Sequence, residues 1–388
     1  MREHHLRGSL MLRGVTAYGT RLVLAVWLVV CVLAPAASQE PRDEWKQAKS
    51  DRHLEFPRDH WSHPDYRIEW WYYTGNLEGE RGQRFGYQLT FFRVGVDRIP
   101  SNPSVWTVRD LYMTHLAVTD IDGGRHLVSE RLNRAGVSWA GARTDRLEVW
   151  NEDWRLEERD GNHVLRAVSS DGAFGVDLLL HAAQRPVLHG RDGFSQKGLQ
   201  AGNASHYYSL TRMETTGEIQ LGRESVSVSG LSWMDHEFGT TFLEPSQQGW
   251  DWFSLQLEDG TDLMVYMLRQ QDGASDSHSS GTLILPNAQP MILGSTDVVL
   301  TPGRTWVSPS SEGRYPVEWR IQVPSQDLYL EVSAAVDSQE LHTEQSTGVT
   351  YWEGAVLAEG MRAGQPVVGR GYLEMTGYSG RPMSEVLR

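Results

Sequence analysis

The sequence predicts an all-β protein that consists of two consecutive antiparallel barrels. Three observations support this fold class. Hydrophobic residues recur with a period of two from residue 66 onward, Asp-Gly turn signals separate the alternating runs, and the second half of the chain echoes the first. The composition agrees, because 15 Trp, 14 Tyr and 38 Gly in 388 residues favour strands and tight turns over helical bundles.

The predicted strands of the first half follow one another closely. Alternating runs cover residues 69–77, 84–94, 111–119, 147–156, 164–168 and 176–180. Hairpin turn signals lie at residues 122–124, 160–162, 171–172 and 259–260. Amphipathic helical patterns are nearly absent, so we expect a sandwich or a barrel.

Aromatic strands of the first half reappear in the same order in the second half. Residues 70–73 resemble 250–253, 207–209 resemble 351–353, and 229–235 resemble 370–376. Chance similarity among strands is the alternative, but ordered echoes favour a duplication. We therefore predict a first barrel over residues 66–242 and a second over residues 243–388.

The first 38 residues have the pattern of a secretory signal peptide. Arg13 and Arg21 precede an apolar run at residues 22–33, and small residues follow at 34–38. That run is short for a membrane span, so an uncleaved anchor is the lesser alternative. The pattern predicts an exported protein, periplasmic or secreted.

Cleavage at this point would leave a mature chain without cysteine, because Cys31 lies in the apolar run. Such a chain folds without disulfides. The formal net charge of −14 argues against nucleic acid as a partner. Residues 39–65 are expected to form an irregular segment ahead of the first barrel, and translation starts at Met1 or Met11.

Two aromatic-rich runs carry most of the functional signal. In residues 206–212, His206 stands two positions before Tyr208, and in residues 230–239, Trp233 stands two positions before Asp235. Residues i and i+2 of a strand share a face, so each run sends a ring and an acid/base group to one side. We expect both pairs to enter the same space.

The repeat discriminates between the two halves. Its alignment places Thr350 at the position of His206 and Thr376 at that of Asp235. The second copy would then lack both ionisable groups, so any chemistry is expected in the first half.

These motifs resemble the bacterial carotenoid 1,2-hydratases (hydroxyneurosporene synthases) and the related AttH-like secreted proteins. The matching segments are residues 67–77, both runs above, 351–356 and 369–374. The resemblance extends from about residue 50 to the C-terminus and implies two lipocalin-like (calycin) barrels.

The hydratase branch of this family implicates a His followed two residues later by an aromatic, and an aromatic followed by an Asp. His206 and Asp235 match in type and spacing. Tyr208 and Trp233 match only as aromatics, since the hydratases carry Trp and then Tyr there. Together with the signal peptide, this difference places the chain nearer to the secreted AttH-like branch.

Two functions follow from the residues and the resemblance. The first is binding of a hydrophobic lipid or isoprenoid ligand, with an ABC transporter permease of the envelope as partner. The alternative is a cofactor-independent hydratase-type lyase that adds water to an isoprenoid C=C bond. In it Asp235 is the acid, His206 is the base, and Trp233 and Tyr208 stabilise the cation. A structural envelope protein is a third possibility.

Further side chains are expected to bind the ligand, namely Tyr207, Trp71, Tyr73 and Glu69. Glu69 shares a strand face with Trp71 and Tyr73. For Glu69, however, a structural ion pair with Arg93 or Arg67 is the stronger expectation. The corresponding structural alternative for Asp235 is an ion pair with Arg212.

No cofactor and no metal are expected. The sequence contains no dinucleotide fingerprint, phosphate loop or zinc-protease motif, and the absence of a Gly-x-Ser-x-Gly elbow disfavours a serine hydrolase. Strand alternation sends His236 to the face opposite Asp235, which argues against a metal site there. His60 and His63 with Asp65 form the other weak candidate.

Overall fold

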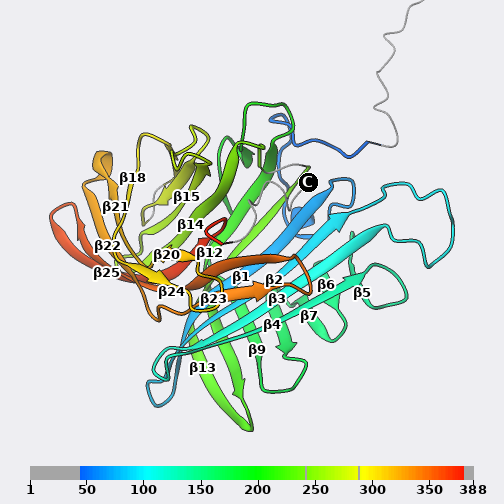
Figure 1. Ribbon diagram of the computed structural model, residues 1–388, viewed down its shortest axis with the longest axis horizontal. Helices are drawn as coiled ribbons and strands as arrows, with labels where there is room; N and C mark the ends of the chain where they lie inside the picture. Colours follow the sequence, from blue (N-terminus) through cyan, green and yellow to red (C-terminus); the bar gives the residue numbers. More distant parts are fainter. Residues whose placement is uncertain (1–43, 241–242, 287–288, 380–388) are drawn as a thin grey trace, which may run out of the picture. The chain divides into compact units, whose positions relative to one another are not determined.

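The computed structural model describes residues 44–240, 243–286 and 289–379 (Figure 1). The predicted signal peptide and both candidate start residues lie outside these residues. Apart from two short 3₁₀ helices, η1 (Arg58–His60) and η2 (Pro324–Gln326), the regular structure is entirely β, which confirms the all-β class. No helix in the described part of the chain is both long and apolar enough to span a membrane.

The first sheet is an antiparallel, nearly closed barrel. Its strands are β1 (Ile68–Gly79), β2 (Arg84–Gly95), β3 (Asp110–Asp120), β4 (Arg125–Arg134), β5 (Ala140–Ala142), β6 (Glu148–Asn151), β7 (Trp154–Arg159), β8 (Asn162–Val168), β9 (Phe174–Ala182), β10 (Val187–Leu188), β11 (Phe194–Gln196), β12 (Ala204–Leu221) and β13 (Glu224–Gly239). The strand order is β4-β3-β2-β1-β13-β12-β9-β8-β7-β6-β5, and β10 and β11 pair with β12.

The second sheet is also antiparallel. Its strands are β14 (Gln247–Leu257), β15 (Asp262–Gln270), β16 (Ser280–Ile284), β17 (Met291–Gly294), β18 (Val299–Pro302), β21 (Glu318–Val323), β22 (Leu328–Ala334), β23 (Glu340–Thr343), β24 (Val349–Arg362) and β25 (Gln365–Met375). The strand order is β17-β16-β15-β14-β25-β24-β22-β21-β18, and β23 pairs with β24. A separate hairpin joins β19 (Thr305–Val307) to β20 (Arg314–Pro316).

Both sheets follow one strand plan. The order β3-β2-β1-β13-β12-β9 of the first corresponds to β16-β15-β14-β25-β24-β22 of the second, as a duplication predicts. The change from one sheet to the other falls between Gly239 and Gln247.

Strand register corrects the repeat alignment. In the first sheet, Asp235 lies opposite Tyr72 and Ser209. In the second, Glu374 lies opposite Trp252 and Glu353. The counterpart of Asp235 is therefore Glu374 and not Thr376, so the second copy has kept an acid at this position. The sequence alignment was wrong by two residues. Such an offset keeps the same face of the strand but replaces Thr376 by Glu374 as the residue equivalent to Asp235.

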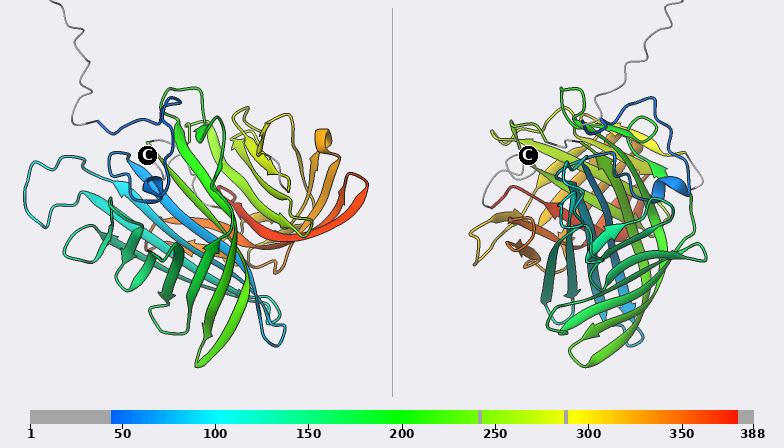
Figure 2. Two further views of the ribbon diagram at one scale, coloured as in Figure 1. Left: turned by 180° about the vertical axis from the view of Figure 1, so that it is seen from behind. Right: turned by 90° about the vertical axis from the view of Figure 1, so that its right-hand side faces the viewer.

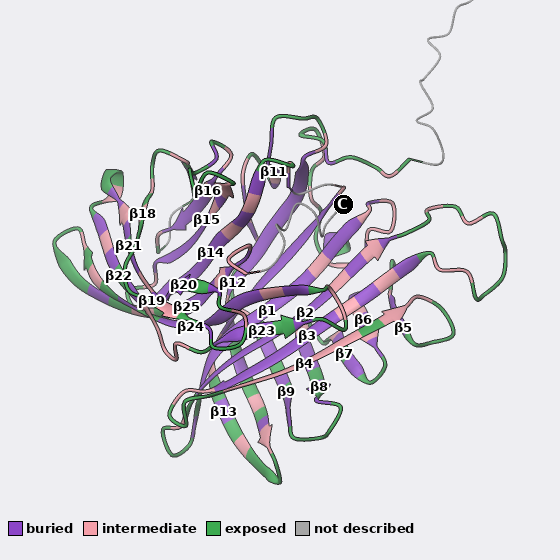
Figure 3. Cartoon of the chain, in the orientation of Figure 1, coloured by how far each residue is buried: buried purple, intermediate pink, exposed green. Residues whose placement is uncertain are grey.

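Three hydrophobic clusters form the core. One fills the first barrel, one lies inside the second sheet, and the third joins the two sheets. The buried positions of Figure 3 follow the strands that face one another, whereas the hairpin end of β12 and β13 is exposed. In the views of Figure 2, the yellow-to-red strands of the second sheet lie against blue and green strands of the first. The candidate site lies in the third cluster.

Candidate functional site between the two sheets

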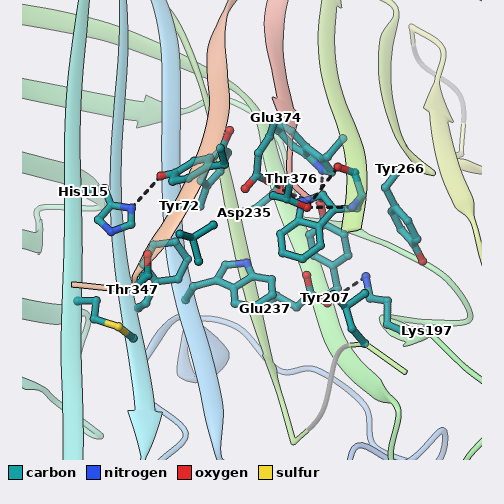
Figure 4. A pocket seen from close by; sticks show the side chains of 18 of the residues that line it. Tyr72, His115, Lys197, Tyr207, Asp235, Glu237, Tyr266, Thr347, Glu374 and Thr376 are labelled. Atoms are coloured by element: carbon teal, nitrogen blue, oxygen red, sulfur yellow. Dashed lines mark hydrogen bonds and ion pairs between the residues drawn. The ribbon is translucent and has the colours of Figure 1, made fainter. Parts of the chain in front are cut away.

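Asp235, labelled in Figure 4, is a buried carboxyl group. Its hydrogen-bond partners are three neutral side chains. Tyr207 Oη donates to its Oδ2 at 2.5 Å, and Trp233 Nε1 donates to its Oδ1 at 2.6 Å. Ser209 Oγ donates to Oδ1 as well. Burial raises the pKa of Asp235 to about 7, although all three hydrogen bonds act in the opposite direction. This carboxyl group can therefore hold a proton near neutral pH.

The predicted structural partner of Asp235 is engaged elsewhere. Arg212 Nη2 lies 2.8 Å from Asp262 Oδ1 in the second sheet. The expected ion pair between Asp235 and Arg212 is therefore wrong, and the pKa of Asp235 stays raised.

A buried histidine orients the serine that bonds to Asp235. His189 Nε2 lies 2.6 Å from Ser209 Oγ, and His189 Nδ1 lies 2.9 Å from Thr282 Oγ1. The single hydroxyl proton of Ser209 goes to the carboxylate, so His189 Nε2 must carry the proton that it shares with Ser209. Burial lowers the pKa of His189 to about 3, which keeps its ring neutral.

Asp235 faces a cavity of about 140 Å³ between the sheets. Its wall is largely apolar, and aromatic rings from both sheets contribute to it: Trp70, Tyr72, Tyr207, Trp252, Tyr266 and Tyr351. Trp252 Nε1 of the second sheet donates to Tyr207 Oη at 3.0 Å, so the ring that binds Asp235 is itself held across the interface. Such a cavity suits an apolar ligand oriented by a few polar groups.

A second acid of the cavity wall is Glu374, the counterpart of Asp235. Trp250 Nε1 donates to its Oε2 at 2.9 Å. Burial raises the pKa of Glu374 to about 7, and the charges of Asp235 and Glu237 add to the rise. Since each negative charge disfavours the other, the state with one of the two acids protonated is favoured near neutral pH.

A single cation lies in the wall among the residues that line this cavity. Lys197 Nζ is 3.1 Å from Glu237 Oε1, and the Glu237 carboxylate also accepts a hydrogen bond from Ser205. The ammonium lies over the rings of Tyr266 and Tyr207, at 4.1 and 5.0 Å from their centroids.

His206 and Tyr208 lie on the opposite face of the sheet from Asp235. In the pairing of β12 with β13, Tyr208 is opposite His236 and Ser209 is opposite Asp235. Within each run the predicted shared face is confirmed, but the two runs do not enter the same space. The pairing of Asp235 as acid with His206 as base stays a prediction, and the strand register does not support it.

A β-bulge causes this separation. The hairpin pairs Leu221 with Glu224, and a regular ladder from that turn would place Leu210 opposite Asp235. His206 would then share the face of Asp235. The register shifts between Leu210 and Met213, so one extra residue on β12 sends Ser209 to that position instead.

The other predicted ligand residues point into the first barrel. Trp71 and Tyr73 belong to its core, and Tyr73 Oη lies 2.8 Å from His163 Nδ1. Glu69 Oε2 is 3.1 Å from Arg93 Nε, which confirms the expected structural ion pair. Of the predicted ligand residues, Tyr207 alone lines the described cavity. The ligand-binding roles of Trp71, Tyr73 and Glu69 stay predictions.

A cluster of polar side chains surrounds Glu69 in the first barrel. His63 Nδ1 and His236 Nε2 both approach Glu69 Oε1, at 2.8 and 3.0 Å, and these three residues could supply ligands to a metal ion. However, Arg93 pairs with Glu69, and the other ring nitrogen of His63 bonds to Asp59 at 2.9 Å. These contacts fit a structural network, and Asp65 pairs with Lys46 instead of joining the cluster.

His206 lies beside this cluster, buried against Phe238 and Tyr66. Neither of its ring nitrogens has a hydrogen-bond partner among the described residues. Burial lowers the pKa of His206 to about 3, so its ring is neutral. Its predicted role as a base stays a prediction that this position does not support.

Sequence reasoning missed Lys197, His189 and Glu374. Lys197 and His189 sit in short connecting segments without a strand pattern, so nothing in the sequence assigns them a face. For Glu374 a signal was present, because the repeat reaches residues 370–376 and only the offset concealed its match to Asp235.

Comparisons with known proteins agree with this architecture. Residues 47–378 match the sequence profile of a family described as AttH-like. The crystal structure of a candidate AttH from Nitrosomonas europaea is 34% identical, covers 86% of this chain and 100% of that chain, and superposes with a TM-score of 0.79.

Two further relatives carry names of enzymes. Kievitone hydratase from Nectria haematococca shares the fold, with 16% identity, a TM-score of 0.66, and coverage of 86% of this chain and 96% of that chain. The dehydratase asqC from Emericella nidulans is 23% identical over 228 residues, which are 56% of this chain and 62% of that protein. The match thus spans less than two thirds of the dehydratase.

Proposed function

This chain belongs to the AttH-like family, and we propose that the cavity between its sheets is a cofactor-independent hydro-lyase site. The reaction adds water to a C=C bond of an apolar substrate, or removes it. One observation carries this proposal: Asp235 presents a buried carboxyl group with a pKa of about 7 to an aromatic cavity. The names of the hydratase and dehydratase relatives support the same reaction class.

In the direction of hydration, Asp235 gives its proton to one alkene carbon. The π bond breaks, a C–H bond forms, and positive charge develops on the neighbouring carbon. Faces of the surrounding rings stabilise that charge by about 0.5–2 kcal/mol each. Water then attacks the cationic carbon and forms the C–O bond.

Glu374 is the base of this reaction. The attacking water loses one proton to its carboxylate, which leaves Asp235 ionised and Glu374 protonated. A proton passes back to Asp235 before the next turnover, so the net change is alkene plus water to alcohol. Dehydration is the reverse sequence with the same two acids.

Binding without chemistry is the second candidate. The largely apolar, aromatic-rich wall favours it, because such a wall suits retention of a lipid or isoprenoid. Under this alternative, Asp235 would only orient the ligand, and a bound molecule would leave the cavity unaltered.

Isotope labelling tests the proposal on a mixture of cellular compounds, so no single substrate has to be chosen. An organic extract of the producing cells is incubated in H₂¹⁸O with the native protein or with Asp235→Asn, and analysed by mass spectrometry. We expect the native protein to add one labelled water to some compounds of the extract. The rate of this labelling should be at least about 100-fold lower with Asp235→Asn.

The control is Asp122→Asn, which removes an exposed carboxylate paired with Arg84 and should leave labelling unchanged. Thermal melting of each variant checks that it is folded. If native protein and Asp235→Asn both retain the same unaltered ligand and label nothing, the lyase proposal fails and the binding alternative stands.

A further inference from the structure

Lys197 is a buried cation in the wall of this aromatic-rich cavity (Figure 4). Its backbone N–H donates to Asn203 O at 2.8 Å, and Gln247 Nε2 donates to its carbonyl oxygen at 2.9 Å. These bonds fix the residue on both sides of its Cα. The Lys197 ammonium therefore has a defined place beside Glu237, between the rings of Tyr207 and Tyr266.

Stability gives no reason for this placement. A buried ion pair contributes little net stability, because desolvation offsets most of the attraction between the charges. A pair of apolar side chains would fill the same volume at least as well. The Lys197–Glu237 pair lines the cavity, so a ligand group is the partner that would justify an ammonium there.

The surrounding charges restrict what this ligand group can be. A ligand carboxylate beside Lys197 would also lie close to Glu237, Asp235 and Glu374, which disfavours a second negative charge. Glu237 and the Tyr266 hydroxyl accept from two of the three ammonium N–H groups, so a hydrocarbon would leave the third without an acceptor. A neutral carbonyl oxygen accepts a hydrogen bond and adds no charge.

We propose that Lys197 binds the carbonyl oxygen of the substrate, and that the substrate is a β-hydroxy carbonyl compound or the conjugated enone that it forms by loss of water. This inference rests on the proposed hydro-lyase function and narrows its substrate class. In this class the C=C bond is conjugated with the carbonyl group, which activates it toward addition and elimination of water, whereas an isolated alkene lacks such activation.

The spacing of the wall residues fits this class. Asp235 and Glu237 stand two residues apart on the cavity face of β13, about 7 Å along the strand. Lys197 lies at the Glu237 position, so one ligand can place its carbonyl oxygen at Lys197 and the carbon next to that carbonyl toward Asp235.

Elimination then proceeds with every atom accounted for. Asp235, in its ionised form, removes the proton from the carbon next to the carbonyl, and negative charge moves to the carbonyl oxygen, where Lys197 donates a hydrogen bond. The C–O bond to the hydroxyl breaks while protonated Glu374 gives its proton to the departing oxygen. The products are the enone and water, and Asp235 and Glu374 have exchanged protonation states.

Equilibrium binding of matched naphthalene probes tests the carbonyl site without any turnover. The probes are 2-acetylnaphthalene, 2-ethylnaphthalene and 2-naphthoate, and quenching of tryptophan fluorescence reports binding. We expect the native protein to bind the ketone about tenfold more tightly than the hydrocarbon, as one hydrogen bond to a charged group allows. Naphthoate should bind more weakly than the ketone.

The key variant is Lys197→Met with Glu237→Gln, which removes both charges and leaves no buried ion unpaired. It should bind ketone and hydrocarbon with equal affinity. The control is Lys46→Met, which removes a surface lysine paired with Asp65 at 2.7 Å and should keep the preference. Melting curves establish that both variants are folded.

The proposal is overturned if the double variant keeps the ketone preference, if the native protein prefers naphthoate or ethylnaphthalene, or if it binds no ketone at the solubility limit. A ketone preference without labelling by ¹⁸O would retain the carbonyl site and reject the lyase. Labelled products that lack a carbonyl group would retain the lyase and reject the carbonyl site.

Discussion

At the scale of the residue, the neighbours of Asp235 decide what its carboxyl group can do. Three donors stabilise the ionised form, and burial opposes them strongly enough to bring the pKa to about 7. A general acid needs this balance, since a group that is always ionised has no proton to give. The same donors hold the carboxyl group in one orientation toward the cavity.

Trp233→Phe tests this balance. It removes the Nε1–H that donates to Asp235 Oδ1 at 2.6 Å and keeps an aromatic ring in place. Because that hydrogen bond favours the ionised form, its loss should raise the pKa of Asp235 above about 7. The fall of lyase activity at alkaline pH would then move to higher pH, which a pH–rate profile measures.

Trp319→Phe is the matched control, because Trp319 Nε1 donates to Pro316 O within the core of the second sheet. It should leave the profile unchanged. A Trp233→Phe profile that moved to lower pH, or not at all, would contradict this account of the Asp235 pKa.

At the scale of the element, the bulge in β12 determines which residues meet in the cavity. The sequence was sufficient to predict the long strands β1, β2 and β3, the organisation in two similar halves and the shared faces of Trp233 with Asp235 and of His206 with Tyr208. The predicted run at 147–156 is two strands, β6 and β7. The sequence was not sufficient to predict how the two runs combine. One inserted residue reverses every face beyond it, and strand alternation does not reveal where it is inserted.

The second sheet holds this bulge in place. Asp262, at the start of β15, accepts a hydrogen bond from Thr211 Oγ1 at 2.8 Å and pairs with Arg212 at 2.8 Å. Gln256 Nε2 donates to Thr211 O at 2.5 Å. The face that β12 presents to the cavity therefore depends on tertiary contacts that local sequence does not encode.

Asp262→Ala should weaken both the fold and the site. Loss of a buried carboxylate leaves Arg212 without its ion-pair partner, and we expect the free energy of unfolding to fall by about 3 kcal/mol. Chemical denaturation measures this change. Asp122→Ala removes an exposed ion pair with Arg84 and should lower the free energy of unfolding far less. Equal effects of the two substitutions would show that Asp262 does not anchor the bulge.

At the scale of the whole molecule, the cavity exists only because two similar sheets meet face to face. Equivalent positions of the duplication contribute to the shared cluster: Tyr72 and Trp252, Tyr207 and Tyr351, Trp233 and Tyr372. The duplication has kept an acid at both equivalent positions, Asp235 and Glu374. Their divergence lies in the surroundings, since the donor set of Asp235 includes a tyrosine, a serine and a tryptophan, whereas Glu374 accepts from Trp250.

Shared burial should make the two sheets unfold together. Tyr72 Oη of the first sheet donates to Glu353 of the second, and Asn76 Nδ2 donates to Gly371 O at 3.1 Å. Separation of the sheets would expose the whole aromatic interface to water. Scanning calorimetry of the protein should therefore show one cooperative transition.

Tyr72→Phe should lower the midpoint of this transition by about 2–4 °C without splitting the transition, because the substitution leaves a buried acceptor unpaired. Tyr329→Phe removes an exposed hydroxyl that donates to Glu331 within the second sheet, and it should leave the midpoint unchanged. Two transitions, of which Tyr72→Phe moved only one, would mean that each sheet is stable alone and that the cavity is a loose contact between independent domains.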